Sequence, residues 1–209
     1  MTEERRVLES FINRYHAVKD LQADILEAFD ILKACFDSGG KLLVCGNGGS
    51  AADSEHIVGE LMKSFKLQRK LGTDEKALFG EEKILAEGLQ NALPAIALTA
   101  HSALVTAIAN DNSADLIFAQ QVWAYAKNSS DVLLAISTSG NSENVLNAVK
   151  TAKALGRKSI AITGADGGKI GEIATVTLRI PESETYLTQE LMLPLYHCLC
   201  AMLEIHYFS

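Results

Sequence analysis

The spacing of hydrophobic residues changes along this chain, and the changes mark the elements it is expected to form. From residue 4 to residue 38, apolar positions recur every three or four residues, which predicts helical structure. Gly39 and Gly40 follow, and glycine is typical of helix ends. Five later runs are apolar throughout and predict strands. These runs are residues 41–47, 93–99, 131–137, 158–164 and 175–180.

Helical patterns separate the predicted strands. They cover residues 50–65, several segments up to 127, a stretch ending at Gly156, and a final helix from about 188, which Pro194 is expected to kink or interrupt. Fully apolar strands that alternate with helices are typical of a parallel sheet buried on both faces. We therefore predict an α/β fold with three layers, in which helices flank a five-stranded parallel sheet. Ligands of such sheets bind at the carboxyl ends of the strands.

Residues 66–92 fit this pattern poorly, because they are highly charged and longer than a usual connection. We interpret them as a surface insertion, partly helical near 81–91, with a role as a lid or in assembly. The 209 residues otherwise suit one domain, in which residues 1–40 form an N-terminal helical segment.

Composition narrows the classes of function. A net charge of −7 argues against binding to nucleic acid. No apolar run approaches the ~18 residues that span a bilayer, so no membrane partner is expected. The start, "MTEERRVLES", lacks an apolar signal region. Four cysteines lie in apolar stretches without a CxxC pair, which predicts buried, reduced thiols and a cytoplasmic protein. They are Cys35, Cys45, Cys198 and Cys200.

Two turns that connect a strand to a helix carry candidate chemistry. The first, "CGNGGS" (45–50), supplies Gly46, Gly48 and Gly49, which allow close approach of a ligand, and Ser50, which is placed to cap the helix. Taken alone, this turn is equally explained as a tight connection.

The second turn, "STSGNS" (137–142), is richer in hydroxyl groups. Neutral hydroxyls at a helix N-terminus can surround a phosphate, whereas one cap needs only one such residue. The excess therefore favours a phosphate site over capping alone, and this site needs no arginine. Its hydroxyls belong to Ser137, Thr138, Ser139 and Ser142.

Two helices carry further candidates. His56 and Glu60 are four residues apart and share one helix face, although such pairs are also common on surfaces. The C-terminal helix carries Gln189 and His197 in a strongly apolar setting. A histidine in that setting is more often a satisfied core residue than a ligand.

In this order, "CGNGGS", "HxxxE", "IANDN", "DVLLAISTSGNSENV" and "RIP…TQEL…YH" resemble the sugar isomerase (SIS) domain, and more closely the phosphoheptose isomerase family. The resemblance covers about residues 30–205 apart from the insertion. It implies an SIS-type fold and interconversion of sedoheptulose 7-phosphate and D-glycero-D-manno-heptose 7-phosphate, a step toward lipopolysaccharide heptose. It also implies a homotetramer with sites at subunit boundaries.

Site roles follow from the same resemblance. It implies a substrate site that includes Asn47, Gly48, Gly49, Ser50, Glu60, Asn110, Asp111, Ser137, Thr138, Ser139, Ser142 and Gln189. It implies a zinc site formed by His56, Glu60, Gln189 and His197. This chain departs from the family at Met192, where a histidine is common, at "ELMKSF", and in the length of the insertion. These departures bear on the choice of sugar.

Isomerisation needs a base that moves a proton between neighbouring carbons and a group that serves the oxygens. We assign the carbon base to Glu60 and the group that serves the oxygens to His197. His197 is alternatively a zinc ligand. A metal-bound Glu60 would be a weaker base, so the two roles of Glu60 compete. Gln189 and His197 are eight residues apart, about 12 Å on a straight helix. One chain therefore reaches a single ion with both residues only if the helix bends. Otherwise the site is shared between chains.

Three other functions stay open. The chain resembles a non-catalytic SIS protein that associates with the bacterial replication initiator, in "ISTxGNS" and "CLC". It could instead isomerise another sugar phosphate such as arabinose 5-phosphate, or sense a sugar phosphate without turnover. The presence of both Glu60 and His197 favours an enzyme.

Overall fold

The five apolar runs form one sheet in the computed structural model, which describes residues 1–209. All neighbouring strands are parallel, and their order is β2-β1-β3-β4-β5. The predicted five-stranded parallel sheet is therefore confirmed. The strands are β1 Leu42–Cys45, β2 Ala95–Ala97, β3 Val132–Ile136, β4 Lys158–Thr163 and β5 Val176–Arg179.

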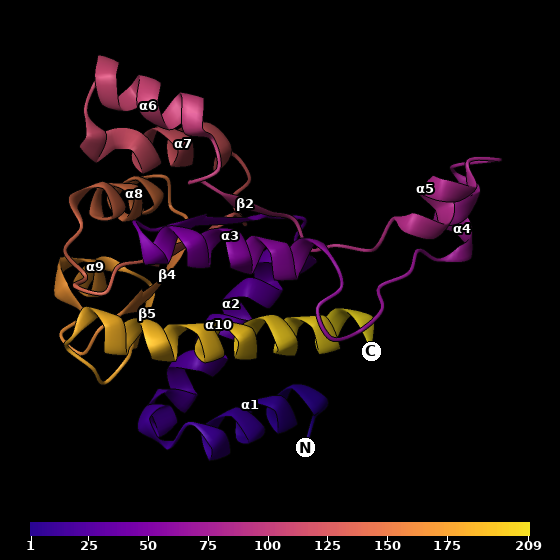
Figure 1. Cartoon of the computed structure of the whole chain (residues 1–209), viewed down its shortest axis with the longest axis horizontal. Coiled ribbons are helices and arrows are strands. Elements are labelled where there is room, and N and C mark those ends of the chain that lie inside the picture. Colours follow the sequence, from indigo (N-terminus) through magenta and orange to yellow (C-terminus); the bar gives the residue numbers. More distant parts are fainter.

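Helices cover both faces of the sheet, as predicted (Figure 1). Alternate strand residues point to opposite faces, so Leu42 and Leu134 join one core while Leu43 and Leu133 join the other. The first core packs against α1 (Glu3–Arg14), α2 (Gln22–Asp37), α3 (Gly49–Met62) and α10 (Thr185–Phe208). The second packs against α7 (Ile117–Tyr125), α8 (Glu143–Ala154) and α9 (Gly168–Ile173). The sequence pattern had not indicated α9.

The N-terminal helical segment is broken where a single pattern had been expected. A short 3-10 helix, η1 (His16–Leu21), separates α1 from α2, and Val18 has non-helical backbone angles. An unbroken helix over residues 4–38 would be about 50 Å long. The break lets α1 lie along α10, where Leu8 and Phe11 are buried.

Helix α10 is continuous, so the expected interruption at Pro194 is wrong. Proline lacks the backbone N–H that would donate a hydrogen bond to the carbonyl four residues earlier. For Pro194 that carbonyl belongs to Glu190, which is exposed to water. By length and composition α10 could cross a membrane, contrary to our expectation that no segment comes near that limit. Its most apolar window is 61% buried, which explains the composition as that of a core helix.

The insertion leaves the body of the molecule as an arm, which we define as residues 71–89 (Figure 1). It contains two short helices, α4 (Thr73–Ala77) and α5 (Lys83–Gly88), so the predicted partial helix is confirmed. No residue of the arm is buried, and Leu78 and Ile84 are each more than four-fifths exposed. Its role as a lid or in assembly stays a prediction.

The four cysteines are free and buried, as predicted. Burial raises the pKa of Cys35, Cys45 and Cys198 to about 12. A thiol with so high a pKa holds almost no reactive thiolate at neutral pH.

Candidate active site between α3 and α10

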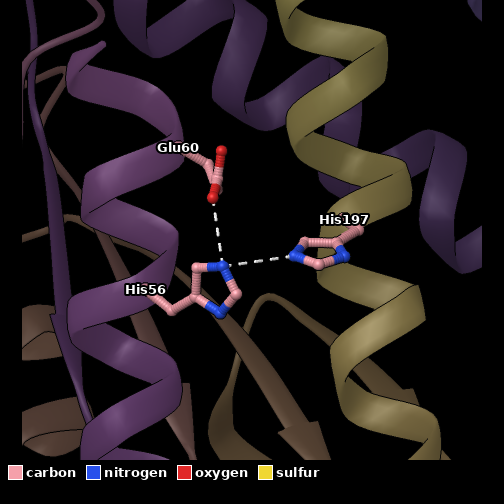
Figure 2. Close-up of side chains that lie close together, drawn as sticks. All are labelled: His56, Glu60 and His197. Carbon is pink, nitrogen blue, oxygen red and sulfur yellow. Dashed lines mark hydrogen bonds and ion pairs between the residues drawn. The ribbon is translucent and has the colours of Figure 1, made fainter. Parts of the chain in front are cut away.

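Helices α3 and α10 lie side by side and bring three candidate residues together (Figure 2). His56 and Glu60 come from successive turns of α3, and His197 comes from α10. One ligand atom from each lies within 4.8 Å of the others. The predicted pairing of His56 with Glu60 is thus part of a larger group rather than an isolated surface pair. We call it the His56–Glu60–His197 group.

The spacing of this group suits a small cation. His56 Nε2 lies 3.0 Å from Glu60 Oε1 and 3.5 Å from His197 Nε2. Two ligands of a tetrahedral zinc ion, each about 2.1 Å from the metal, lie about 3.4 Å apart. The donor atoms present therefore fit a metal in both chemistry and distance.

A hydrogen-bonded chain orients His56 from behind. The buried Tyr196 hydroxyl donates to Asp53 Oδ1 at 3.2 Å and lies 3.0 Å from His56 Nδ1. If the hydroxyl proton goes to Asp53, the oxygen accepts from Nδ1–H of His56, and the Nε2 lone pair then faces Glu60 and His197. In that tautomer, a shared cation would remove the repulsion between the lone pairs.

Glu60 has an unused oxygen. Its Oε2 atom is buried and has no hydrogen-bond partner, although a buried carboxylate oxygen is costly to leave unpaired. Burial, reinforced by the neighbouring His56, lowers the pKa of His197. His197 is therefore neutral at physiological pH, which is the form that accepts a proton or binds a metal.

The two turns adjoin at the carboxyl ends of β1 and β3. Asn47 and Asn144 exchange two amide hydrogen bonds of 2.8 and 2.9 Å across them. Gly48 precedes α3 with φ of +57°, and α3 begins at Gly49. Ser50 lies inside the helix, so the prediction that it caps α3 is wrong.

The hydroxyls of the second turn do not cap α8. Ser142 occupies the position before the helix but makes no side-chain bond to its amides. Instead, Ser137 donates to Ser142 at 3.0 Å, and Ser139 accepts from the Asn141 amide at 3.1 Å. The explanation by capping alone is therefore wrong, while phosphate binding by these residues and Thr138 stays a prediction.

Gln189 lies apart from the His56–Glu60–His197 group in this chain. Its side chain packs against Gly49, where an added Cβ would lie 2.6 Å from Gln189 Nε2. It precedes His197 by eight residues on an uninterrupted helix, about 12 Å of rise. The structure thus brings together three of the four predicted metal ligands and places the fourth at the glycine turn.

Asn110 and Asp111 also lie elsewhere. They are exposed at the end of α6 (Ser102–Asp111), where Asn110 donates to Asp111 at 2.9 Å. Helix α6 packs on α7 and on η2 (Ala114–Leu116). Their contact with substrate stays a prediction.

Sequence reasoning missed Tyr196, which only its contacts with Asp53 and His56 reveal. It also missed Arg69 and Glu204, both fully buried near Glu60. One signal was available, since Glu204 is a lone carboxylate in the apolar stretch "CLCAMLEI".

The fold and the site define a member of the SIS-domain family, whose model matches residues 8–164. The chain is 42% identical over 172 residues to a probable phosphoheptose isomerase of Thermoplasma volcanium, covering 82% of this chain and 76% of that one. It is 37% identical over 191 residues to the phosphoheptose isomerase of Helicobacter pylori, covering 91% and 88%. The structure of phosphoheptose isomerase from Neisseria gonorrhoeae matches with a TM-score of 0.74 and 34% identity, over 97% of this chain and 99% of that one. The chain therefore belongs to the phosphoheptose isomerase family.

Proposed function

We propose that this chain interconverts sedoheptulose 7-phosphate and D-glycero-D-manno-heptose 7-phosphate. Family membership supports the reaction class. The observation that carries the proposal is the unpartnered Oε2 of Glu60 in one group with His197, whose pKa is lowered, where α3 and α10 lie side by side (Figure 2). Ketose–aldose isomerisation requires these two functions, a base for carbon and an acid or base for oxygen.

In the proposed mechanism, Glu60 Oε2 takes a proton from the carbon next to the sugar carbonyl and returns it to the neighbouring carbon. His197 moves the proton between the two oxygens, because its neutral imidazole can accept and then donate. The other oxygen, Oε1, faces His56 at 3.0 Å. In this proposal Oε1 orients the Glu60 carboxylate through His56, and Oε2 transfers the proton.

The phosphate is proposed to bind the two turns, through backbone amides and the hydroxyls of Ser137, Thr138, Ser139 and Ser142. Asn47, Gly48, Gly49 and Ser50 complete this end, with Gln189 beside them. From Gly49 to His56 the helix rises about 10 Å. An extended seven-carbon sugar phosphate has a length of this order, so its first carbons would reach the level of His56 while its phosphate stays at the turns. The Glu60 carboxylate lies at that level, because its Oε1 is 3.0 Å from His56 Nε2.

We further propose that the His56–Glu60–His197 group can hold zinc. An ion there would take a lone pair of His197 and weaken Glu60 as a base, so metal binding by these residues competes with their proposed proton-transfer roles. The nitrogen and oxygen donors, their spacing and the orphaned Glu60 oxygen support a divalent ion of this kind. When bound, such an ion would polarise the sugar carbonyl.

We propose a homotetramer with a shared site and a cytoplasmic location, in line with the four free cysteines. The continuous α10 supports sharing, because one chain cannot present Gln189 and His197 to the same ion. Gln189 from a second chain would complete the ligand set. Asn110 and Asp111 would likewise reach the sugar from a neighbouring chain.

The test is turnover of sedoheptulose 7-phosphate and a panel of other ketose phosphates, including the arabinose 5-phosphate pair, with and without chelator. We expect activity on the heptose. Glu60→Gln should lower kcat by about 10²–10⁴-fold, since general acid–base catalysis contributes that much, with no change in thermal stability. Binding of sugar phosphates without any turnover would instead support the sensor or regulatory function.

A further inference from the structure

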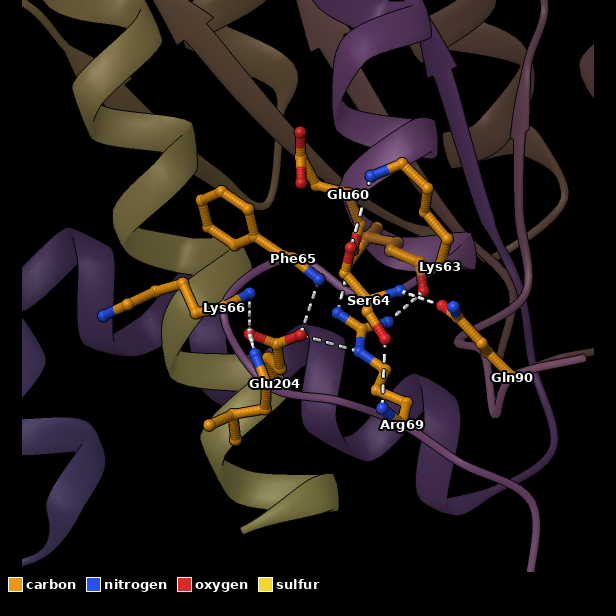
Figure 3. Close-up of polar contacts among 10 residues, drawn as sticks. Glu60, Lys63, Ser64, Phe65, Lys66, Arg69, Gln90 and Glu204 are labelled. Carbon is orange, nitrogen blue, oxygen red and sulfur yellow. Dashed lines mark hydrogen bonds and ion pairs between the residues drawn. The ribbon is translucent and has the colours of Figure 1, made fainter. Parts of the chain in front are cut away.

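Helix α3 ends just after Glu60 with an unusual cap. The residue after Met62, Lys63, is extended, and no glycine closes the last turn. The side chain of Arg69 replaces the missing cap: its Nη2 donates to the carbonyl of Glu60 at 2.8 Å and its Nη1 to that of Leu61 at 2.6 Å (Figure 3). The guanidinium therefore fixes the backbone of the residue that carries the candidate base.

Arg69 is itself held by α10. Its Nε donates to Glu204 Oε1 at 2.8 Å, and both side chains have 0% exposure. The guanidinium lies over the Phe208 ring, 4.7 Å from its centre. Arg69 is the one buried polar residue among residues 66–92, and its side chain lies fully in the core.

Glu204 also gathers the loop that follows α3. It accepts backbone hydrogen bonds from Phe65 at 2.8 Å, Lys66 at 2.7 Å and Leu67 at 3.1 Å (Figure 3). The Phe65 ring packs against His197, with ring centres 5.2 Å apart. The same carboxylate is thus linked to Glu60 through Arg69 and to His197 through Phe65.

A buried ion pair is weak evidence for stability, because desolvation offsets much of the attraction. A role in geometry explains this pair better, since its contacts reach both residues of the candidate site: the Glu60 carbonyl through Arg69 and the His197 ring through Phe65. We propose that Arg69 and Glu204 are positioning residues that hold Glu60 and His197 at their working separation. This inference rests on the proposed function, in which those two residues act together.

Two variants test it. Glu204→Gln keeps the shape but loses the charge and one acceptor, and Arg69→Lys keeps the charge but loses the planar fork that spans two carbonyls and a carboxylate. We expect each to weaken Co²⁺ binding, followed by absorbance titration, by about 10–100-fold, as for residues that orient metal ligands. We expect kcat on the heptose phosphate to fall by a similar factor while KM changes little.

Asp131→Asn is the matched control. Asp131 is also a buried carboxylate, 1% exposed, that accepts from the Lys41 ammonium and from two backbone amides. It lies at the amino end of β3, away from the site. We expect this variant to lose thermal stability while Co²⁺ affinity and kcat stay at the wild-type values.

The outcomes separate the two proposals. The positioning role would be overturned by the following result. Arg69→Lys or Glu204→Gln folds and loses stability as Asp131→Asn does, but keeps the wild-type Co²⁺ affinity and kcat. If Glu204→Gln does not fold, Arg69→Lys decides. A wild-type chain that binds Co²⁺ but isomerises no sugar phosphate refutes the proposed function alone, because metal affinity still reports on positioning. A chain that does neither overturns both.

Discussion

At the scale of single residues, the arrangement around His56 explains how an exposed histidine on a helix acquires a defined orientation. The Tyr196 hydroxyl, which also donates to Asp53, contacts Nδ1 of His56, and Nε2 of the same ring is directed at Glu60. Such outer partners set which nitrogen carries the proton and how the ring is oriented. Tyr196 comes from α10 and Asp53 from α3, so the contact also joins the two helices.

Tyr196→Phe should therefore reduce metal affinity and kcat by about 10–100-fold. The change removes only the hydroxyl and leaves the ring in the core. Tyr207→Phe is the control, since the Tyr207 hydroxyl donates to Lys33 and Asp37 near the other end of α10. Equal losses of Co²⁺ affinity in the two variants would contradict a specific role for Tyr196.

At the scale of elements, α3 and α10 form the site because they touch at two levels. Gln189 meets Gly49 near the start of both helices, and His197 meets His56 about two turns further on. The φ angle of Gly49 is not positive, so its backbone conformation does not call for glycine. The reason for glycine here is instead the close approach of the Gln189 side chain. A methyl group there would displace the amide end of Gln189.

Gly49→Ala tests this contact. We expect KM for the sugar phosphate to rise by up to about tenfold, since a net hydrogen bond is worth about 0.5–1.5 kcal/mol. Thermal stability should change little because the flexible Gln189 side chain can move. Gly59→Ala, on the same helix with nothing within 4 Å of the added atom, should leave KM unchanged and stabilise the protein by about 0.5–1 kcal/mol. Identical kinetics for both variants would count against a role for Gln189 in substrate binding.

The contact of α10 with the loop after α3 predicts a dependence of stability on pH. Burial by itself would raise the pKa of Glu204, but hydrogen bonds from Phe65, Lys66 and Arg69 outweigh it and lower the pKa from its ordinary value of 4.5. The unfolded chain therefore binds a proton more readily than the folded one. This contribution to stability is complete above about pH 4.5 and is lost as the pH falls through the lowered value.

Chemical denaturation of the wild type and Glu204→Gln between pH 7 and pH 3 measures that effect. At pH 7 the variant should be less stable by about 3–5 kcal/mol, the usual cost of breaking a buried pair. The gap should narrow as the pH falls below 4.5, because the wild-type carboxylate then becomes protonated. A gap that stays constant with pH would show that Glu204 is not preferentially ionised in the folded state.

At the scale of the whole molecule, a single chain presents an incomplete set of the predicted residues. The His56–Glu60–His197 group is assembled within one chain, whereas Gln189, Asn110 and Asp111 lie elsewhere. The arm, with α4 and α5, extends away from the rest of the chain (Figure 1), and its Leu78 and Ile84 are exposed. The proposed homotetramer, in which neighbouring chains complete each site, would account for the separated residues.

Mixed assemblies of His197→Ala and Gln189→Ala chains test the sharing. If the site takes Gln189 from a neighbour, one chain supplies an intact metal group and the other an intact Gln189, so mixing restores activity. Glu60→Gln with His197→Ala should give no rescue, because those residues belong to one chain. Failure of the first pair, with mixed assembly shown by native mass spectrometry, would rule out sharing through Gln189.

Much of the site could be predicted from local sequence. His56 and Glu60 are four apart on one helix, and the hydroxyls of "STSGNS" follow a strand directly, so short-range geometry already places them. Tyr196, Arg69 and Glu204 could not be predicted in this way. Their partners are 140, 143 or 135 residues away in the chain, and no local pattern encodes such pairings.

The order of apolar strands and helices by itself determined the parallel sheet and placed both turns at its carboxyl edge, because burial on both faces leaves continuous apolar runs in the chain. Only the tertiary structure decided that Pro194 leaves α10 intact, that His197 meets Glu60, and that Gln189 does not. These outcomes depend on how two helices pack side by side. That packing is set by the summed contacts of distant residues, such as Leu8 and Ile57, rather than by the residues of the site.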